Sequence, residues 1–385
     1  MMTSIRQLVR ATQPMRVIAL AIGYTVSATG SQAQAPLVFV HGINSNASTW
    51  GTFPNDIASF VPVTGRATSL SSFSYYGTQA SQLGSALPGL FNQGPLGNLI
   101  AVGHSNGGIV SRELAKTQSI QGLITIGTPH SGVPLATAAV QNYLIPFLQG
   151  WIGDLASPVS EYLGLLINDT ACPVVCYGFW QRINIYAGNI QAGLNLAGFA
   201  IGGQLQTTVL GQMDAVSGYH YASLNNANAL AVESTHIPRR IAIVSEANAS
   251  YISMWNGLAP GSAGTLSAMT RSMGLLYGGL YEYFSTYTDY SDPLMWQARQ
   301  DAWKWAVGSS QLFNIDYFWC NIIGGNWNGQ CHGDGIVPTA GQQWPGAPTT
   351  YLLTGGPGHS QETQDQTVRQ RVITALQTGG FNFTP

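Results

Sequence analysis

The chain has 385 residues, a length typical of one α/β sheet that carries insertions. Hydrophobic residues make up 45% of the chain, which excludes a disordered protein and allows a large core. Charged residues make up only 8%, against about 25% in average proteins, and the formal net charge is −2 without any basic cluster, so a nucleic-acid partner is excluded.

The N-terminus has the pattern of a secretory signal peptide. Three arginines precede the apolar run 17–22, and small residues follow it up to Ala33. A charged region, an apolar region and a small-x-small cleavage site are the three parts of such a peptide. The alternative, a membrane anchor, is disfavoured because the apolar run is short and ends in small and polar residues. We therefore expect residues 1–33 to be removed and the mature protein to be secreted, either extracellular or periplasmic.

Short apolar runs and helical segments alternate along the first part of the mature chain. Strands are predicted at 36–40, 98–102 and 122–126, and a helix at 108–116. Further strands are predicted at 240–245 and 351–353, with a closing helix at 361–377. Strands that alternate with helices predict a mostly parallel central sheet flanked by helices, with function at the carboxyl ends of the strands.

Two apolar stretches interrupt this alternation. We expect a core at about 34–131, 212–246 and 333–385, and two largely helical insertions at about 132–211 and 247–332. Both insertions follow strand ends, so both should rise over the carboxyl edge of the sheet. They are interpreted either as ordinary packed cap helices or as a lid or acyl-binding wall, and their apolar density does not separate the two.

The four cysteines lie in these insertions. An even number of cysteines in an exported chain favours disulfides. Local pairing would join Cys172 to Cys176 and Cys320 to Cys331, each closing a short loop. The alternative is four free buried thiols. A zinc site is less favoured, because only His332 stands beside a cysteine.

The segment 103–107 has the sequence Gly-His-Ser-Asn-Gly, which fits the pattern G-x-S-x-G around a nucleophilic serine. In that pattern the serine occupies a tight turn between a strand and a helix, and the glycines let the two elements approach each other. The expected strand precedes the segment and the expected helix follows it. Ser105 is therefore the candidate nucleophile, and the helix start behind it favours a developing anion.

A serine nucleophile needs a base, an acid that orients the base, and donors for the oxyanion. His359 is the candidate base, because it lies on a glycine-rich loop after the last strand. Asp334 is the candidate acid, on a glycine-flanked turn 25 residues earlier. The backbone N–H groups of Ile43 and Asn106 are the candidate oxyanion donors. The histidines and aspartates that fit these roles less well are His104, His220, His236, His332, Asp301 and Asp316.

Five segments resemble the bacterial lipase and esterase branch of the α/β-hydrolase family. They are 38–43, 102–108, 126–132, 334–338 and the Gly-His pair at 358–359, together with a weaker match at 213–225. The order Ser, Asp, His along the chain is the order used in that fold. The resemblance covers about half of the mature chain, and the two insertions depart from it. It implies that His130 supports the site and does not take part in the chemistry.

These observations predict a secreted carboxylic ester hydrolase, a lipase or esterase that acts on apolar esters through an acyl-enzyme. No metal or organic cofactor is expected. Lipid or another apolar ester is the expected partner, and adsorption to a lipid or polymer interface is considered. A polyester depolymerase and an acyltransferase with the same triad are the alternatives within serine catalysis. A catalytically silent binding protein on a hydrolase scaffold is the alternative outside it.

Overall fold

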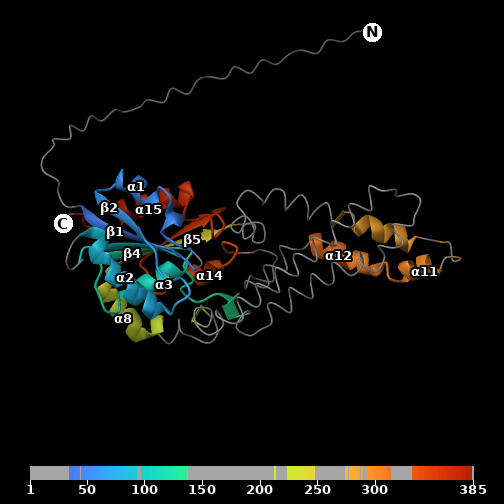
Figure 1. Cartoon of the computed structure of the whole chain (residues 1–385), viewed down its shortest axis with the longest axis horizontal. Coiled ribbons are helices and arrows are strands. Elements are labelled where there is room, and N and C mark those ends of the chain that lie inside the picture. Colours follow the sequence, from blue (N-terminus) through green and yellow to red (C-terminus); the bar gives the residue numbers. More distant parts are fainter. Residues whose placement is uncertain are drawn as a thin grey trace, which may run out of the picture. The chain divides into compact units, whose positions relative to one another are not determined.

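A central sheet of six parallel strands organises the chain in a computed structural model (Figure 1). The strands are β1 (Ala35–Val40), β2 (Val63–Thr68), β3 (Ile100–His104), β4 (Gly122–Ile126), β5 (Arg239–Glu246) and β6 (Thr349–Thr354). Their order across the sheet is β2-β1-β3-β4-β5-β6, and every neighbouring pair is parallel. The predicted fold class, a mostly parallel sheet with flanking helices, is confirmed.

The structure describes the sheet, its helices and parts of the second expected insertion. The described residues are 34–43, 45–92, 97–134, 136–137, 212–213, 223–247, 274–275, 277–286, 288, 291, 293–313 and 332–383. The expected signal peptide at 1–33, all four cysteines and nearly all of the first insertion lie outside these residues. The predictions of cleavage and of disulfide pairing therefore stay predictions.

Burial along each strand follows its position in the sheet. All residues of β1, β3 and β4 are buried, as expected for central strands of a parallel sheet that is covered on both faces. The outer strands β2 and β6 contain exposed residues. The five predicted strands all form: β4 has the predicted ends, and the ends of the other strands differ by at most two residues. Thus β3 begins at Ile100 and runs on to His104, because it pairs with β4 from Gly122 to Ile126.

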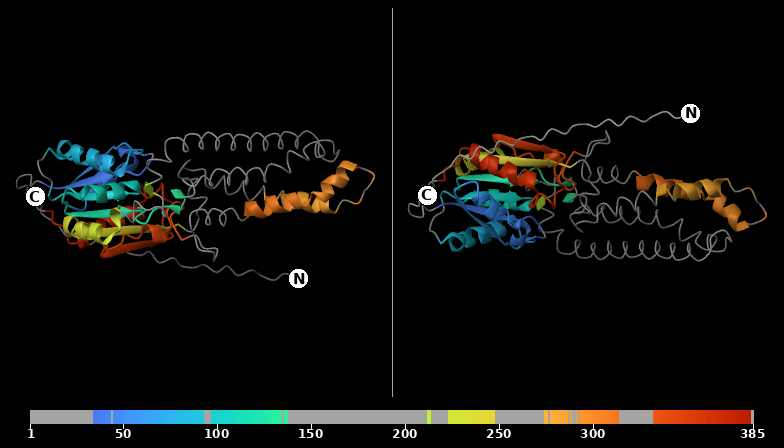
Figure 2. Two further views of the ribbon diagram at one scale, coloured as in Figure 1. Left: turned by 90° about the horizontal axis from the view of Figure 1, so that it is seen from below. Right: turned by 90° about the horizontal axis from the view of Figure 1, so that it is seen from above.

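Helices cover both faces of the sheet. Helices α1 (Phe53–Ala58) and α15 (Gln366–Thr378) lie on one face, and α2 (Tyr76–Phe91), α3 (Asn106–Leu114) and α8 (Ala227–His236) on the other (Figure 1). In Figure 2 the yellow helix α8 is seen from below and the red helix α15 from above. Successive side chains of a strand point to opposite faces, so β1 contributes to both resulting cores. Val38 and Val40 join the core under α2 and α3, and Leu37 and Phe39 join the core under α1 and α15.

The described part of the second expected insertion is helical. It contains α11 (Pro293–Gln300), α12 (Trp303–Phe313) and a helical stretch at 277–285. The stretch at 277–285 packs against α12 through buried aromatic rings, because Tyr277 lies edge-on to Trp305 and Phe284 stacks on Trp305. Among the described residues, no helix is both long enough and apolar enough to cross a membrane.

Candidate active site

Ser105 occupies the turn between β3 and α3 with a positive φ of 53° and a ψ of −128°. A residue that carries a side chain rarely adopts this backbone conformation, so the surrounding structure has to impose it. The flanking glycines make the turn sterically feasible. A Cβ at Gly103 would lie 2.5 Å from the Gly108 backbone, and one at Gly107 would lie 2.2 Å from the carbonyl oxygen of Val40. The structure therefore explains why this turn needs glycine on both sides of the serine.

The turn lies at a point where the strand order reverses. β1 pairs with β2 on one side and with β3 on the other, so the connections that leave β1 and β3 diverge. In open parallel sheets, sites form in the crevice at such a point, beyond the carboxyl ends of the strands. Ser105 follows β3 there, and the segment 41–43 follows β1. The chain has the α/β-hydrolase fold.

Ser105, His359 and Asp334 form one chain of hydrogen bonds, although 254 and 25 positions separate the bonded pairs. Ser105 Oγ is 2.8 Å from His359 Nε2, and His359 Nδ1 is 2.7 Å from Asp334 Oδ2. All three side chains are buried. A carboxylate can only accept, so Nδ1 carries the hydrogen and Nε2 presents its lone pair to the serine hydroxyl. The structure thus brings together the three residues that the sequence singles out.

The Asp334 carboxylate is fixed at both oxygens. While Oδ2 accepts from His359, Oδ1 accepts from the backbone N–H groups of Ile336 at 2.9 Å and Val337 at 2.7 Å. The backbone adds a further tie, because the N–H of His359 donates to the carbonyl of Asp334 at 2.8 Å. These bonds leave the carboxylate little freedom to rotate away from the imidazole.

The segment 41–43 lies against the nucleophile. A Cβ at Gly42 would be 2.9 Å from Ser105 Cβ and 3.3 Å from its Oγ. His41 accepts a hydrogen bond from the Leu70 N–H at Nε2 (2.8 Å), so its Nδ1 carries the hydrogen and donates to the Gly42 carbonyl at 2.7 Å. That bond fixes the peptide plane whose N–H belongs to Ile43, because the carbonyl and N–H of a trans peptide point in opposite directions. Burial lowers the pKa of His41, consistent with a neutral ring.

Asn106 begins α3 directly after the nucleophile and is fully buried. Its side-chain amide donates to Gln79 Oε1 on α2 at 3.0 Å, so the side chain is held on the α2 side of the helix. Ser105 donates its own N–H to the Ile126 carbonyl at 2.9 Å. The N–H of Ser105 is therefore engaged with β4, and the backbone donors left for an oxyanion at this turn come from the residues after it.

His130 lies in the support behind the site. It is buried, stacks on Trp344 with ring centroids 5.0 Å apart, and bonds to Thr125 and Arg112. Arg112, on α3, forms a fully buried ion pair with Glu233 of α8. This network ties the helix that follows the nucleophile to its neighbours.

The other histidines and aspartates named in the sequence analysis do not join the chain of hydrogen bonds. His236 Nδ1 bonds to the carbonyl of Ala115, His332 pairs with Glu246, and Asp301 pairs with Lys304 one turn away. His104 lies beside the site but its Nε2 bonds to the His359 carbonyl and to Glu362. His220 and Asp316 lie outside the described residues.

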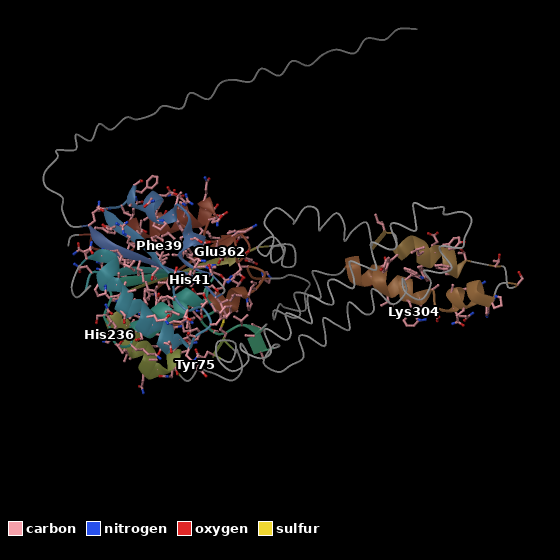
Figure 3. The ribbon with its side chains drawn as sticks, viewed as in Figure 1. Phe39, His41, Tyr75, His236, Lys304 and Glu362 are labelled. Atoms are coloured by element: carbon pink, nitrogen blue, oxygen red, sulfur yellow. The ribbon has the colours of Figure 1, made fainter. Side chains whose placement is uncertain are left out.

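Sequence reasoning missed Glu362. This carboxylate is 0% exposed and lies 3.7 Å from His359 Nδ1. Figure 3 labels Glu362 among the side chains of the sheet and its flanking helices. With His104 and His359, Glu362 forms a set of three side chains whose donor atoms lie within 4.8 Å of one another, the spacing of a metal site. In the structure His104 Nε2 is hydrogen-bonded to Glu362 Oε2, and His359 Nδ1 is hydrogen-bonded to Asp334 Oδ2, so each of these two ring nitrogens already has a carboxylate partner.

The protonation of His359 sets a pH dependence. Burial lowers its pKa, but the charge of Asp334, the hydrogen bond to Asp334 and the charge of Glu362 raise it more, to about 9. Only the neutral imidazole can take a proton from Ser105, so a base with a raised pKa is inactive at low pH. We expect kcat/KM to climb with pH through the neutral range and to reach half of its plateau value at about pH 9. A pH–rate profile from about pH 6 to about pH 10 checks this, and a profile already flat at neutral pH would contradict it.

No family model matches the sequence, and no curated protein matches it. Solved structures are similar in fold. A lipase of Bacillus licheniformis in its mature form has 16% identity and a TM-score of 0.44, with 89% of this chain and 92% of that chain covered. A gene product of Listeria innocua has 10% identity and a TM-score of 0.41, with 91% and 97% covered. A metagenomic carboxyl esterase has 11% identity and a TM-score of 0.40, with 88% and 68% covered. At such low values the fold class rests on the topology of this chain itself.

Proposed function

We propose that the protein is a carboxylic ester hydrolase that works through an acyl-enzyme. The observation that carries the proposal is the continuous chain from Ser105 through His359 to Asp334, built on a serine with a positive φ at the crevice of the sheet. A buried, oriented serine–histidine–carboxylate arrangement supplies a nucleophile, a base and a group that stabilises the imidazolium.

In the proposed reaction, Ser105 Oγ attacks the ester carbonyl while its proton passes to His359 Nε2. The tetrahedral intermediate collapses as His359 returns the proton to the leaving alcohol, which leaves an acyl-serine. A water molecule then attacks the acyl carbonyl while its proton passes to His359. The second intermediate collapses by breaking the bond to Ser105 Oγ, which receives that proton from His359, and the acid is released. Asp334 stays ionised throughout and holds the imidazole in the tautomer that the first step needs.

The N–H groups of Ile43 and Asn106 are the proposed donors to the oxyanion. Their support is position: Ile43 belongs to the segment that lies against Ser105, and Asn106 is the first residue of the helix behind it. Each well-aligned donor to an oxyanion lowers the barrier by roughly 3–4 kcal/mol. The bond from His41 to the Gly42 carbonyl would hold the first donor in place before substrate arrives.

Apolar, poorly soluble esters are the proposed substrates. Support comes from the described part of the second insertion, which exposes large apolar side chains and has few charges. The exposed apolar side chains are Leu275, Tyr281, Tyr283, Trp296, Trp303 and Val307, each more than a third exposed. Tyrosine and tryptophan suit the boundary between water and an apolar phase, so this surface would favour adsorption to a lipid droplet or a polymer.

A chain-length series of p-nitrophenyl esters tests the substrate class. Burial of an acyl chain stabilises by about 0.8 kcal/mol per methylene, so kcat/KM should rise several-fold with each added carbon pair until the pocket ends. Activity on an emulsified triglyceride or a polyester film, rising above the solubility limit, is expected beside it. A maximum at acetate or butyrate, without activity on emulsions or films, would leave a small-ester esterase.

Export and the two local disulfides belong to the proposal and rest on the sequence alone. The mass of the exported protein should correspond to loss of residues 1–33. Peptide mapping under non-reducing conditions should give the pairs Cys172–Cys176 and Cys320–Cys331, with short-loop closure stabilising by about 2–3 kcal/mol. Four alkylatable thiols, or a bridge between Cys172 and Cys331, would contradict the local pairing.

A further inference from the structure

A second buried carboxylate lies beside the proposed base. Glu362 comes three residues after His359, in the turn that precedes α15, and none of its surface is exposed. Its Oε2 is 3.0 Å from His104 Nε2 and 3.7 Å from His359 Nδ1, while Oε1 has no hydrogen-bond partner in the described part of the chain. An ionised carboxylate with so few donors is costly to bury, so its position next to the imidazole calls for a role.

The space for this carboxylate is built by the end of β4. Gly127 follows β4 with a φ of 54°, and a Cβ there would lie 2.0 Å from Glu362 Oε2. Only glycine therefore allows the carboxylate to lie this close to the strand. The loop that bears the base is thus fitted against β4 through Glu362, and against β3 through His104.

His104 joins the nucleophile turn to the base loop. Its Nε2 faces two acceptors, the His359 carbonyl at 2.9 Å and Glu362 Oε2 at 3.0 Å, so this nitrogen carries the hydrogen. The His104 and His359 rings lie 4.9 Å apart, and the edge of Trp50 packs against His104. His104, the residue before Ser105, therefore holds the main chain of His359, whose imidazole must reach the Ser105 hydroxyl.

The imidazole of His359 faces two negative charges. Asp334 is hydrogen-bonded to Nδ1 at 2.7 Å, and Glu362 is within 3.7 Å of the same nitrogen. The other titratable groups of this cluster are His104, which bonds to Glu362, and His41, which interacts with His104. A negative charge this near, in a buried site, favours the imidazolium over the neutral ring.

We propose that Glu362 is a positioning residue for His359: with His104 it anchors the main chain of the base, and its charge makes the proton affinity of the imidazole depend on two carboxylates. The inference rests on the proposed function and deepens it. Glu362 contacts no reacting atom. Its negative charge stabilises the imidazolium that forms during attack, and it narrows the pH range in which the free enzyme has a neutral base.

Glu362→Gln separates the charge from the shape, because glutamine can still accept the hydrogen bond from His104. We expect the acid limb of the kcat/KM profile to move to lower pH by about one unit or more, with little change in KM. Below the wild-type midpoint, the variant would then retain about tenfold more of its own plateau activity than the wild type does. A purely structural glutamate would lower activity at every pH without moving the midpoint.

Two variants control this experiment. Glu113→Gln removes the same charge from a partly buried position of α3, where Glu113 pairs with Lys116 at 2.7 Å, and should leave the midpoint unmoved. Glu362→Asp keeps the charge, so its midpoint should stay within about 0.3 units of wild type even where the plateau falls. Should Glu362→Gln fail to fold, Glu362→Ala removes the same charge, and its midpoint should likewise move down by about one unit.

The inference is overturned by a Glu362→Gln midpoint equal to that of wild type, or by a Glu362→Asp midpoint that moves down by a full unit. Following the His359 ring by NMR titration of histidine-labelled protein gives the same readout without substrate. Activity that survives Ser105→Ala contradicts the proposed function instead, so the two failures are distinguishable.

Discussion

Ser105→Ala is expected to lower kcat/KM for ester hydrolysis by at least about 10³-fold and to leave the fold intact. On the described turn, the Ser105 hydroxyl is hydrogen-bonded to His359 Nε2, which can take its proton. Alanine has no hydroxyl, so it has no atom that can attack the carbonyl. The remaining rate would come from oxyanion donors and substrate binding. The measurement is initial-rate kinetics on a p-nitrophenyl ester, with circular dichroism and thermal unfolding to confirm folding.

Ser111→Ala is the matched control. Ser111 is also a buried serine, six residues after Ser105 on α3, and its hydroxyl donates to the Gly107 carbonyl at 2.8 Å. Its removal costs about 1 kcal/mol of stability and should leave kcat/KM close to wild type. Near-wild-type turnover by Ser105→Ala, with either result for Ser111→Ala, would contradict the assignment of the nucleophile.

Asp334→Asn is expected to lower kcat by about 10³- to 10⁴-fold. The backbone N–H groups of Ile336 and Val337 require an acceptor at the position of Oδ1, so they select the orientation in which the asparagine oxygen faces them. The amide NH₂ then faces His359 Nδ1 and makes that nitrogen an acceptor. The ring hydrogen moves to Nε2, where it points at Ser105 and blocks proton transfer.

Two other aspartates serve as comparisons for Asp334→Asn. Asp301 pairs with Lys304 and accepts a hydrogen bond from Gln297 on the described helical segment, so Asp301→Asn should leave turnover nearly unchanged. Asp316→Asn should also retain activity. If Asp316→Asn proves to be the inactive variant, the acid comes from the second insertion and the assignment of Asp334 is wrong.

The sequence alone predicted much of the sheet, and the three residues that it proposed for catalysis lie together in the structure. The reason is local. Central strands such as β3 and β4 are continuous apolar runs, and Gly103 and Gly107 mark the tight turn around Ser105 directly in the sequence. Whether these residues act as a triad stays a proposal, because the structure shows their geometry and not their chemistry.

Elements with weaker local signals were missed or misplaced. The edge strand β2 contains Gly65 and Arg66 and lacks an apolar run. The closing helix was predicted from residue 361, but α15 starts at Gln366, because Asp365 caps it by accepting from the N–H groups of Thr367 and Val368. Residues 361–364 therefore form a turn and not the first part of the helix, and Glu362 is buried within this turn.

Glu362 itself has no signal in the sequence. It stands three positions after the predicted base in a run of polar residues, and nothing in that run distinguishes it from its neighbours. Its burial arises from the fit of Gly127 against its carboxylate and from a hydrogen bond to His104, 258 positions away. Contacts of this range depend on how the loops after β3, β4 and β6 meet, which periodicity and spacing do not encode.

Labelling with a fluorophosphonate probe tests the central claim most directly. A serine activated by His359 attacks the phosphorus, displaces fluoride and becomes a stable phosphonyl ester, so one equivalent of probe should attach and abolish esterase activity. Peptide mass mapping should place the label on Ser105, and both Ser105→Ala and heat-unfolded protein should stay unlabelled. A folded, active enzyme that takes up no probe, or that carries the label on a different residue, would contradict the account.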